Sequence, residues 1–530
     1  LIFNKTNQTT KKYLKSFGIY MKKREFNFEK IHNFLEQNVN VCPNNIGIET
    51  PYTKLTYEEL SFRVLHLCSS LLKNNVKKGD RIALLSKNDS SFCELMFACS
   101  ILNLVLVPIN FRLAKLEVEY ILNDSNSKMI FYGEEFEILI KNLNFKSLLE
   151  NKTVRITQDG NYNNFLSKIK LKFAFEKGSM TPLFQMYTSG TTGKPKGVLI
   201  SQSNIISLIQ NGKDKMGPFH ENSISLVCMP LFHIAGSAWL FCGLALGCHN
   251  ILVVDIDSKN IIECLNQRLV TCTLLVPSVI HMLCNEAEKQ NITITNLKTL
   301  VFGAAPMPVN LLKRAEYVMP NTDFIHVYGL TETTGMFTSL NLSQKANFNR
   351  LESCGKCFEN SEIRIVDELG EKLPNYKIGQ IICKSPQIMV GYYNNKGETE
   401  KAIKDNWFQT GDAGYIDKDG FIFVKDRIKD VVISGGENIY SAEVENILLE
   451  HPNVSEVSVI GLPDIKWGEV VTAIIVAFDV HNNNFDIELI RFCDDKLAKF
   501  KIPKKFIYIK TLPKNASGKV LKNELRKIYK

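Results

Sequence analysis

The first half of the chain alternates short apolar segments with longer amphipathic ones, and no other feature constrains the fold as much. Residues 80–86 and 104–109 are apolar enough to form buried strands, and residues 90–103 between them have the length of a helix. Strands that alternate with helices indicate βαβ units and a mostly parallel sheet. The pattern returns after residue 197 and continues to about residue 302. We therefore predict an α/β fold with two stacked α/β subdomains.

Two local signals predict where individual elements begin and end. Thr56 followed by Glu59 forms a capping box, which predicts a helix that begins there and ends near Asn75. Asn103 stands just before the strand at residues 104–109. Asparagine tolerates the left-handed backbone region better than most residues, so a tight turn is expected at this position.

The length and the change of pattern along the chain predict several domains. A chain of 530 residues at 45% apolar composition is globular and too long for one core. Residues 361–379 change to short antiparallel strands, which suggest a small β-barrel, and a compact α+β unit begins near Lys429. We predict a disordered basic extension at residues 1–24, a large domain at residues 25–428 and a small domain at residues 429–530.

Charge and cysteine content exclude several classes of function. The net charge is +9, and residues 496–530 hold twelve Lys or Arg against one acidic residue. A basic tail suits a triphosphate as well as nucleic acid, and no aromatic ladder or zinc-knuckle spacing supports nucleic acid. The fourteen cysteines lie mostly in apolar runs, as expected for reduced thiols in the cytoplasm. Cys354 and Cys357 form the one close C-x-x-C pair, which without a second pair predicts no metal site.

The stretch between Glu221 and Asp255 is long and uncharged enough to resemble a membrane-spanning segment. No Asp, Glu, Lys or Arg lies between Glu221 and Asp255, a length that exceeds the roughly twenty apolar residues of a spanning helix. Pro230, Gly236 and Gly243 interrupt the stretch. We predict a buried strand, turn, helix and strand here instead of a transmembrane helix.

Residues 186–197, with the sequence MYTSGTTGKPKG, have the composition of a phosphate-binding loop. Glycines let the backbone approach a ligand with its amide groups exposed, hydroxyl groups add short donors, and lysines add positive charge. The stretch is not a Walker A loop, because no G-x-x-x-x-G-K-[ST] pattern occurs. The candidate phosphate ligands are Thr188, Ser189, Gly190, Thr191, Thr192, Gly193 and Lys196.

Together with four later motifs, this stretch resembles the adenylate-forming acyl-CoA synthetases. The motifs are PLFH at 230–233, YGLTE at 328–332, TGD at 410–412 and SGK at 517–519, and the resemblance extends from about Leu55 to Val520. It implies an enzyme of the acid–thiol ligase type that binds ATP, Mg²⁺ and coenzyme A. The carboxylate substrate itself attacks the α-phosphorus of ATP, so the protein mainly positions and neutralises the reacting groups.

The resemblance also implies a role for each matching residue. Glu332, with Thr188, would hold Mg²⁺; Thr331 would contact the α-phosphate; Tyr328 and Gly329 would lie beside the adenine. Asp412 and Arg427 would bind the ribose. The nucleoside turn would consist of Gly303, Ala304, Ala305 and Pro306, in which Ala304 replaces a glycine usual in the family.

In the C-terminal part, the resemblance implies a mobile domain that carries the catalytic Lys519. Lys429 would be the hinge, and Gly435 with Gly436 would line the channel for the pantetheine arm. His233 would flank the acyl site, although a lone histidine in an apolar run is equally explained as a core residue.

For the acid, the sequence favours a medium- or long-chain fatty acid. The stretch around His233 lacks the carboxylate that an amino-acid substrate would need for its ammonium group. The alternatives are an aryl-CoA ligase for a benzoate, cinnamate or succinylbenzoate type of acid, an acyl-AMP ligase that serves a carrier protein, and a non-catalytic nucleotide- or acyl-binding protein. We expect a cytoplasmic protein with no nucleic-acid partner; contact with a membrane surface and a homodimer stay open.

Overall fold

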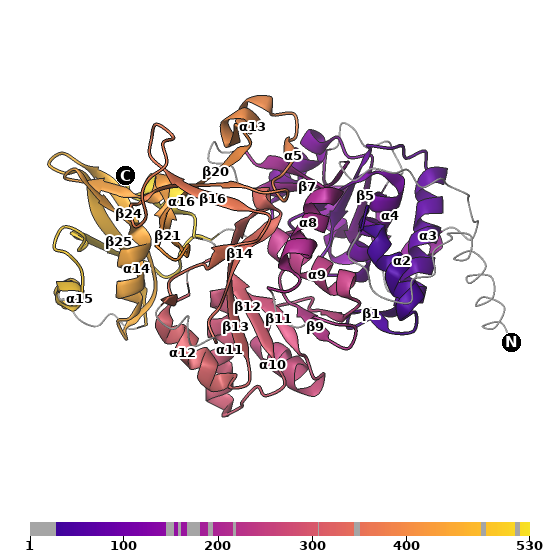
Figure 1. The fold of residues 1–530 in the computed structure, drawn as a ribbon, viewed down its shortest axis with the longest axis horizontal. Coiled ribbons are helices and arrows are strands. Elements are labelled where there is room, and N and C mark those ends of the chain that lie inside the picture. Colours follow the sequence, from indigo (N-terminus) through magenta and orange to yellow (C-terminus); the bar gives the residue numbers. More distant parts are fainter. Residues whose placement is uncertain are drawn as a thin grey trace.

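The computed structural model describes residues 28–144, 153–156, 161–166, 181–188, 194–215, 219–305, 307–343, 350–478, 484–494, 496–514 and 520–530. The predicted extension at residues 1–24 lies outside them. Figure 1 shows two sheets with helices between them in the N-terminal part, and a smaller α+β part at the far end, drawn in yellow. This arrangement confirms the predicted α/β class with a large N-terminal and a small C-terminal part.

One sheet of the N-terminal part has seven strands within the described residues, in the order β18-β8-β7-β4-β3-β5-β6. Its central pairs β3–β4, β3–β5 and β4–β7 are parallel, as the alternating pattern predicts. The strands are β3 (Arg81–Leu85), β4 (Val105–Ile109), β5 (Met129–Gly133), β6 (Thr153–Ile156), β7 (Pro182–Thr188), β8 (Lys196–Ser201) and β18 (Gly391–Tyr392). The helices that accompany it are α3 (Tyr57–Lys73), α4 (Ser90–Leu102), α5 (Lys115–Ser125), α6 (Glu137–Lys141) and α7 (Asn161–Phe165), with the 3₁₀ turn η1 (Glu134–Phe136).

The second sheet has nine strands, in the order β15-β14-β13-β12-β11-β9-β10-β1-β2 among the residues that are described. Strands β9 to β13 pair in parallel, and β14 turns back against β13. The strands are β1 (Ile46–Glu49), β2 (Lys54–Thr56), β9 (Ile224–Val227), β10 (His249–Leu252), β11 (Cys272–Leu275), β12 (Thr299–Gly303), β13 (Asp323–Leu330), β14 (Gly335–Asn341) and β15 (Lys356–Cys357). The associated helices are α2 (His32–Val41), α8 (Gln202–Gly212), α9 (Ile234–Leu246), α10 (Ser258–Gln267), α11 (Pro277–Gln290) and α12 (Val309–Val318), with the 3₁₀ turn η2 (Thr331–Thr333).

Two smaller sheets complete the chain, the first antiparallel and the second mixed, because one of its strand pairs is parallel. The first is the segment predicted as a small barrel; its pairings form a five-stranded antiparallel sheet, and its closure into a barrel stays a prediction. Its elements are β16 (Glu362–Val366), β17 (Gly379–Lys384), α13 (Lys396–Ala402), β19 (Ile403–Lys404), β20 (Trp407–Ile416), β21 (Ile422–Arg427) and η4 (Ile428–Asp430). The C-terminal unit contains β22 (Val432–Ser434), β23 (Glu437–Ile439), α14 (Ser441–Leu449), β24 (Val454–Asp464), β25 (Gly468–Ala477), α15 (Phe485–Asp494), β26 (Lys505–Tyr508) and α16 (Lys522–Tyr529). The domain boundary at Lys429 stays a prediction.

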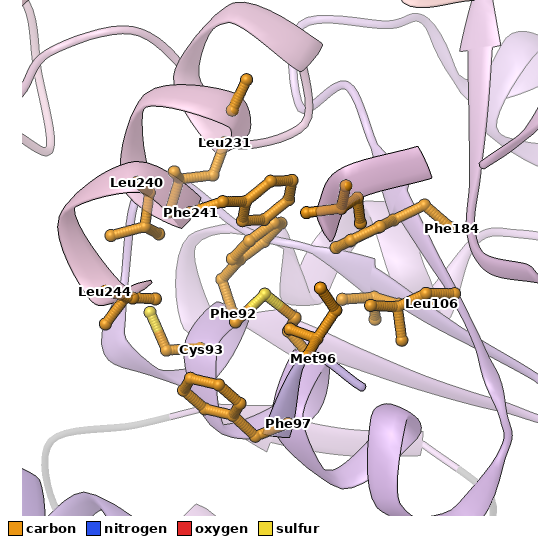
Figure 2. Packing of buried hydrophobic residues seen from close by; sticks show 14 of the residues in the cluster. Phe92, Cys93, Met96, Phe97, Leu106, Phe184, Leu231, Leu240, Phe241 and Leu244 are labelled. Carbon is orange, nitrogen blue, oxygen red and sulfur yellow. The ribbon is translucent and has the colours of Figure 1, made fainter. Parts of the chain in front are cut away.

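The uncharged stretch between Glu221 and Asp255 forms β9, a turn, α9 and β10, as predicted. Twelve of the thirteen residues of α9 are buried, because the helix lies between the two large sheets. Figure 2 shows Phe241 of α9 packed against Phe92 of α4 and Phe184 of β7. Among the described residues, none of the helices combines the length and the apolar character that a membrane crossing requires.

The predicted capping box at Thr56 and the predicted turn at Asn103 are both confirmed. Thr56 caps α3, its side chain accepts from the Glu59 amide, and the Glu59 carboxylate accepts in return from the Thr56 amide. Asn103 follows α4 in the left-handed conformation, with φ of 54°. Its side-chain oxygen accepts from Lys30 Nζ at 2.7 Å, so this asparagine also fastens the N-terminal segment to the core.

Candidate active site

The centre of the candidate site lies where β12 and β13 end. The two strands are parallel and adjacent, with Gly303 opposite Val327, so the residues after each strand share one edge of the sheet. A Cβ at Gly303 would lie 2.3 Å from the Val327 carbonyl oxygen, and one at Gly329 would lie 1.8 Å from the carbonyl oxygen of Gly335. Both glycines are therefore required by close backbone packing. Ala304 and Ala305 follow β12 and are exposed, and Pro306 lies outside the described residues.

Tyr328, Asp412 and Arg427 form one hydrogen-bonded group. The Tyr328 hydroxyl donates to Asp412, and Arg427 Nε lies 2.8 Å from Asp412 Oδ1. Asp412 and Arg427 are register partners on β20 and β21, which explains how residues that are apart in the sequence meet. Burial and the neighbouring Asp412 carboxylate raise the pKa of Tyr328, so its hydroxyl stays a donor. The group presents a carboxylate with a cation beside it, next to an aromatic ring.

Glu332 lies in η2 directly after β13, with Thr331 before it, and both are half-buried. The Tyr392 hydroxyl donates to Glu332 Oε1 at 3.0 Å, and the Glu332 carbonyl accepts from the Met389 amide at 2.8 Å. The Glu332 carboxylate therefore has a defined direction. One carboxylate with room for water and phosphate oxygens is the donor set that Mg²⁺ prefers at a nucleotide, so the residues present fit this ion.

The phosphate-loop residues lie at the end of the β7–β8 hairpin. Thr188 and Lys196 are register partners on these two strands. The residues between them, Ser189, Gly190, Thr191, Thr192 and Gly193, lie outside the described part of the chain. The Lys196 ammonium lies 5.1 Å from the centre of the Tyr392 ring and pairs with Glu398. Tyr392 thus connects Lys196 with Glu332.

His233 caps the N-terminus of α9. Its Nδ1 accepts from the Ala235 amide at 3.2 Å, and burial lowers its pKa to about 4. The side chain is therefore neutral at physiological pH, which suits contact with an apolar acid better than the pairing of a charge. The helix begins close to η2, because a Cβ at Gly335 would lie 3.2 Å from Ala238 and 3.6 Å from Ile234.

Of the C-terminal candidates, Lys429 lies within electrostatic reach of Asp412 and Arg427. Lys429 is within η4, and burial lowers its pKa. Gly435 and Gly436 form the turn between β22 and β23, with φ of 62° and 86°. The Gly435 amide donates to the Trp467 carbonyl at 2.8 Å. Lys519 lies outside the described residues. The roles predicted for these four residues stay predictions.

Three residues of the site were missed in the sequence analysis. They are Tyr392, Glu398 and Thr410; Thr410 accepts from Arg427 NH1 through its carbonyl at 3.2 Å and from the Asp412 amide through Oγ1 at 3.1 Å. Tyr392 and Glu398 belong to a segment that none of the motifs named in the sequence analysis includes. Thr410 could have been found, because it begins the TGD motif.

Profiles of known families match most of the chain. The profile described as AMP-binding enzyme matches residues 35–393, and the one described as AMP-binding enzyme C-terminal domain matches residues 443–519. The chain belongs to the AMP-binding enzymes.

Individual relatives of this AMP-binding enzyme are CoA ligases. It is 33% identical over 503 residues to a 2-succinylbenzoate–CoA ligase of Bacillus mycoides, a match that covers 94% of this chain and 99% of the relative. It is also 33% identical over 498 residues to the long-chain-fatty-acid–CoA ligase FadD13 of Mycobacterium tuberculosis. This match covers 93% of this chain and 97% of FadD13.

A solved structure agrees with these relatives. The o-succinylbenzoate CoA synthetase of Bacillus subtilis, in complex with its acyl-adenylate intermediate, matches with a TM-score of 0.82 and 30% identity, over 93% of this chain and 98% of that one. The same enzyme has also been solved with ATP and a magnesium ion. The chain is thus an AMP-forming acid–thiol ligase that uses ATP, Mg²⁺ and CoA, as the sequence predicts.

Proposed function

We propose that this AMP-binding enzyme is an aryl-CoA ligase that activates an aromatic acid of the 2-succinylbenzoate class. The observation that carries the proposal is the near full-length similarity to 2-succinylbenzoate–CoA ligases, in sequence and in structure. This choice replaces the fatty acid that the sequence favours. The acid would first displace pyrophosphate from ATP to give an acyl-adenylate, and the CoA thiol would then displace AMP to give the thioester.

The packing around α9 supports a compact acid. The Phe92 and Phe184 rings stack with centroids 5.9 Å apart, and the Phe184 and Phe241 rings stack at 5.5 Å. These rings fill the space between α9 and the seven-stranded sheet. An alkyl tail that extended past the first turn of α9 would have to displace a close-packed aromatic cluster.

We further propose a role in binding or catalysis for each residue of the candidate site. Asp412 would accept the ribose hydroxyls with Arg427 beside it, and Tyr328 with Gly303, Ala304 and Ala305 would form the wall around the base. Glu332 would hold Mg²⁺, which when bound would neutralise phosphate charge. Lys196 would contact the terminal phosphates, and Lys519 would steady the α-phosphate during attack. Neutral His233 would border the acid.

A fatty acid is the second candidate. The similarity to FadD13 is equal in identity and nearly equal in length, so it favours a long-chain acid on its own. The two candidates differ in the space that the apolar part of the substrate needs. A long-chain acid would require the aromatic cluster under α9 to move, and a compact aryl acid would leave it in place.

Carboxylate-dependent ATP–pyrophosphate exchange tests the proposal. The panel contains 2-succinylbenzoate, benzoate, cinnamate, octanoate and palmitate, each with and without CoA, and Lys519→Ala is the control for adenylation. We expect exchange with an aryl acid, at a kcat/KM at least tenfold above that for palmitate, and thioester only when CoA is present. Palmitate as the best substrate would overturn the aryl proposal in favour of the second candidate.

A further inference from the structure

A short segment at residues 391–402, comprising β18 and α13, lies against the phosphate-loop hairpin. Tyr392 of β18 pairs with Val198 of β8, and the Tyr393 amide donates to the Gly197 carbonyl at 2.8 Å. The register brings α13 directly beside Lys196. A segment almost 200 residues further along the sequence thus forms one wall of the candidate phosphate site.

Glu398, in the first turn of α13, is the anionic partner of Lys196. Its Oε2 accepts from Lys196 Nζ, and its Oε1 accepts from Lys401 Nζ at 2.8 Å. The Glu398 amide donates to Asn395 Oδ1 at 3.2 Å, which caps the helix and fixes the position of the residue. Bonds from Lys196 and Lys401 lower the pKa of Glu398 to about 2, so this carboxylate is ionised at physiological pH.

Both carboxylate oxygens therefore face a lysine, as the oxygens of a phosphate group would. The Lys196 side chain is 13% exposed and the Glu398 side chain 24% exposed, so both side chains are largely shielded from solvent. Shielding strengthens the attraction, and a phosphate that takes over Lys196 must compete with a charge already in place.

We infer that Glu398 is a stand-in for the terminal phosphates of ATP: it holds Lys196 in the free enzyme and releases it when ATP binds. The inference rests on the proposed phosphate contact of Lys196. Glu398 is then a positioning residue that lowers the affinity for ATP and for pyrophosphate. Because the same carboxylate recaptures Lys196 when pyrophosphate leaves, it also speeds the release of this product.

The test compares Glu398→Gln with Glu400→Gln in the full-length protein. Glu400 lies on the same helix and is exposed, and its contact is Lys396 at 3.6 Å, so both variants remove one negative charge at nearly the same place. Calorimetry measures the Kd of Mg·ATP, pyrophosphate and AMP without any acid. If the ion pair occupies Lys196 about 90% of the time, its loss strengthens ATP and pyrophosphate binding by up to about tenfold. In Glu400→Gln we expect the Kd values of Mg·ATP and pyrophosphate to change by no more than about twofold. The Kd of AMP, which lacks the terminal phosphates, should stay unchanged in Glu398→Gln.

Several outcomes would overturn the inference. Weaker ATP binding in Glu398→Gln would mean that the carboxylate supports Lys196 instead of competing for it. An equal change for AMP, or an equal change in Glu400→Gln, would mean a general effect of charge. Glu398→Ala serves as a second variant, and thermal unfolding verifies that both are folded. These binding constants need no acid, so they are independent of whether the aryl proposal holds.

Discussion

At the scale of single residues, the Tyr392 hydroxyl is the group that orients Glu332. We predict that Tyr392→Phe raises the Mg²⁺ concentration needed for half-maximal adenylation by about tenfold, because a carboxylate that loses its orienting donor holds a metal less well. Tyr393→Phe is the matched control: its ring lies under the Arg81 guanidinium, 3.9 Å from the ring centre, away from Glu332. Equal Mg²⁺ dependence in the two variants would contradict this role.

The neighbouring residues Ala304 and Ala305 provide a second prediction, about backbone strain. Ala304 has φ of 66°, where a Cβ costs roughly 1–2 kcal/mol, and Ala305 has no such conformation. We predict that Ala304→Gly increases the free energy of unfolding by about 0.5–1 kcal/mol after the entropy of the glycine in the unfolded chain is subtracted. Ala305→Gly should decrease it by about 0.4–1 kcal/mol, because only the entropy remains.

Denaturant titration of both variants measures this difference. Two changes of the same sign would show that Ala304 is not strained. If Ala304→Gly also changes the KM for ATP, then the extra methyl group of this chain shapes the nucleoside site as well as the stability of the turn.

At the scale of elements, the position of α9 depends on Gly236. A Cβ there would lie 2.4 Å from the carbonyl oxygens of both Met229 and Pro230, and these backbone atoms cannot move aside cheaply. We predict that Gly236→Ala costs more than about 2 kcal/mol of stability, and that it raises the KM for the acid because His233 moves with the helix.

Gly397 is the control for this prediction. It lies in α13 with open space around its Cα, so Gly397→Ala should stabilise the protein by up to about 1 kcal/mol through helix propensity alone. Thermal unfolding of both variants, together with their acid KM values, makes the comparison. If Gly236→Ala and Gly397→Ala changed stability and the KM for the acid by similar amounts, α9 would be able to shift without a loss of stability.

At the scale of the whole molecule, the sequence predicts local structure and motif residues better than contacts between distant segments. The capping box at Thr56 and the turn at Asn103 depend on neighbours in the sequence, and both are as predicted. Tyr392 and Glu398 could not be predicted, because they reach the site only through the pairing of β18 with β8. The proposed preference for an aryl acid likewise rests on how α4, β7 and α9 pack together, which no single stretch encodes.

Three histidines in separate regions, of which His32 and His326 are buried and His233 is half-buried, predict how the whole molecule responds to acid. Burial lowers the pKa of His32 to about 3, and of His233 and His326 to about 4, from an ordinary value near 6.5. Above pH 6.5 these histidines are neutral in both the folded and the unfolded chain, so they do not change the free energy of unfolding with pH. Between pH 6.5 and 4 the unfolded chain takes up protons that the folded chain excludes, so the free energy of unfolding falls.

These three groups together contribute at most about 4 kcal/mol per pH unit to the slope, since each proton contributes about 1.4 kcal/mol per pH unit. We predict a steep fall of the thermal midpoint from pH 6.5 towards 5, measured by circular dichroism. His326→Gln removes one of the groups, whose Nδ1 lies 2.8 Å from the Ser353 carbonyl, and should make the slope shallower by up to about 1.4 kcal/mol per pH unit. The exposed His220→Gln should leave it unchanged. An unchanged slope in His326→Gln would assign the acid sensitivity to paired carboxylates such as Glu398, whose pKa the bonds from Lys196 and Lys401 lower to about 2, and the fall would then lie below pH 5.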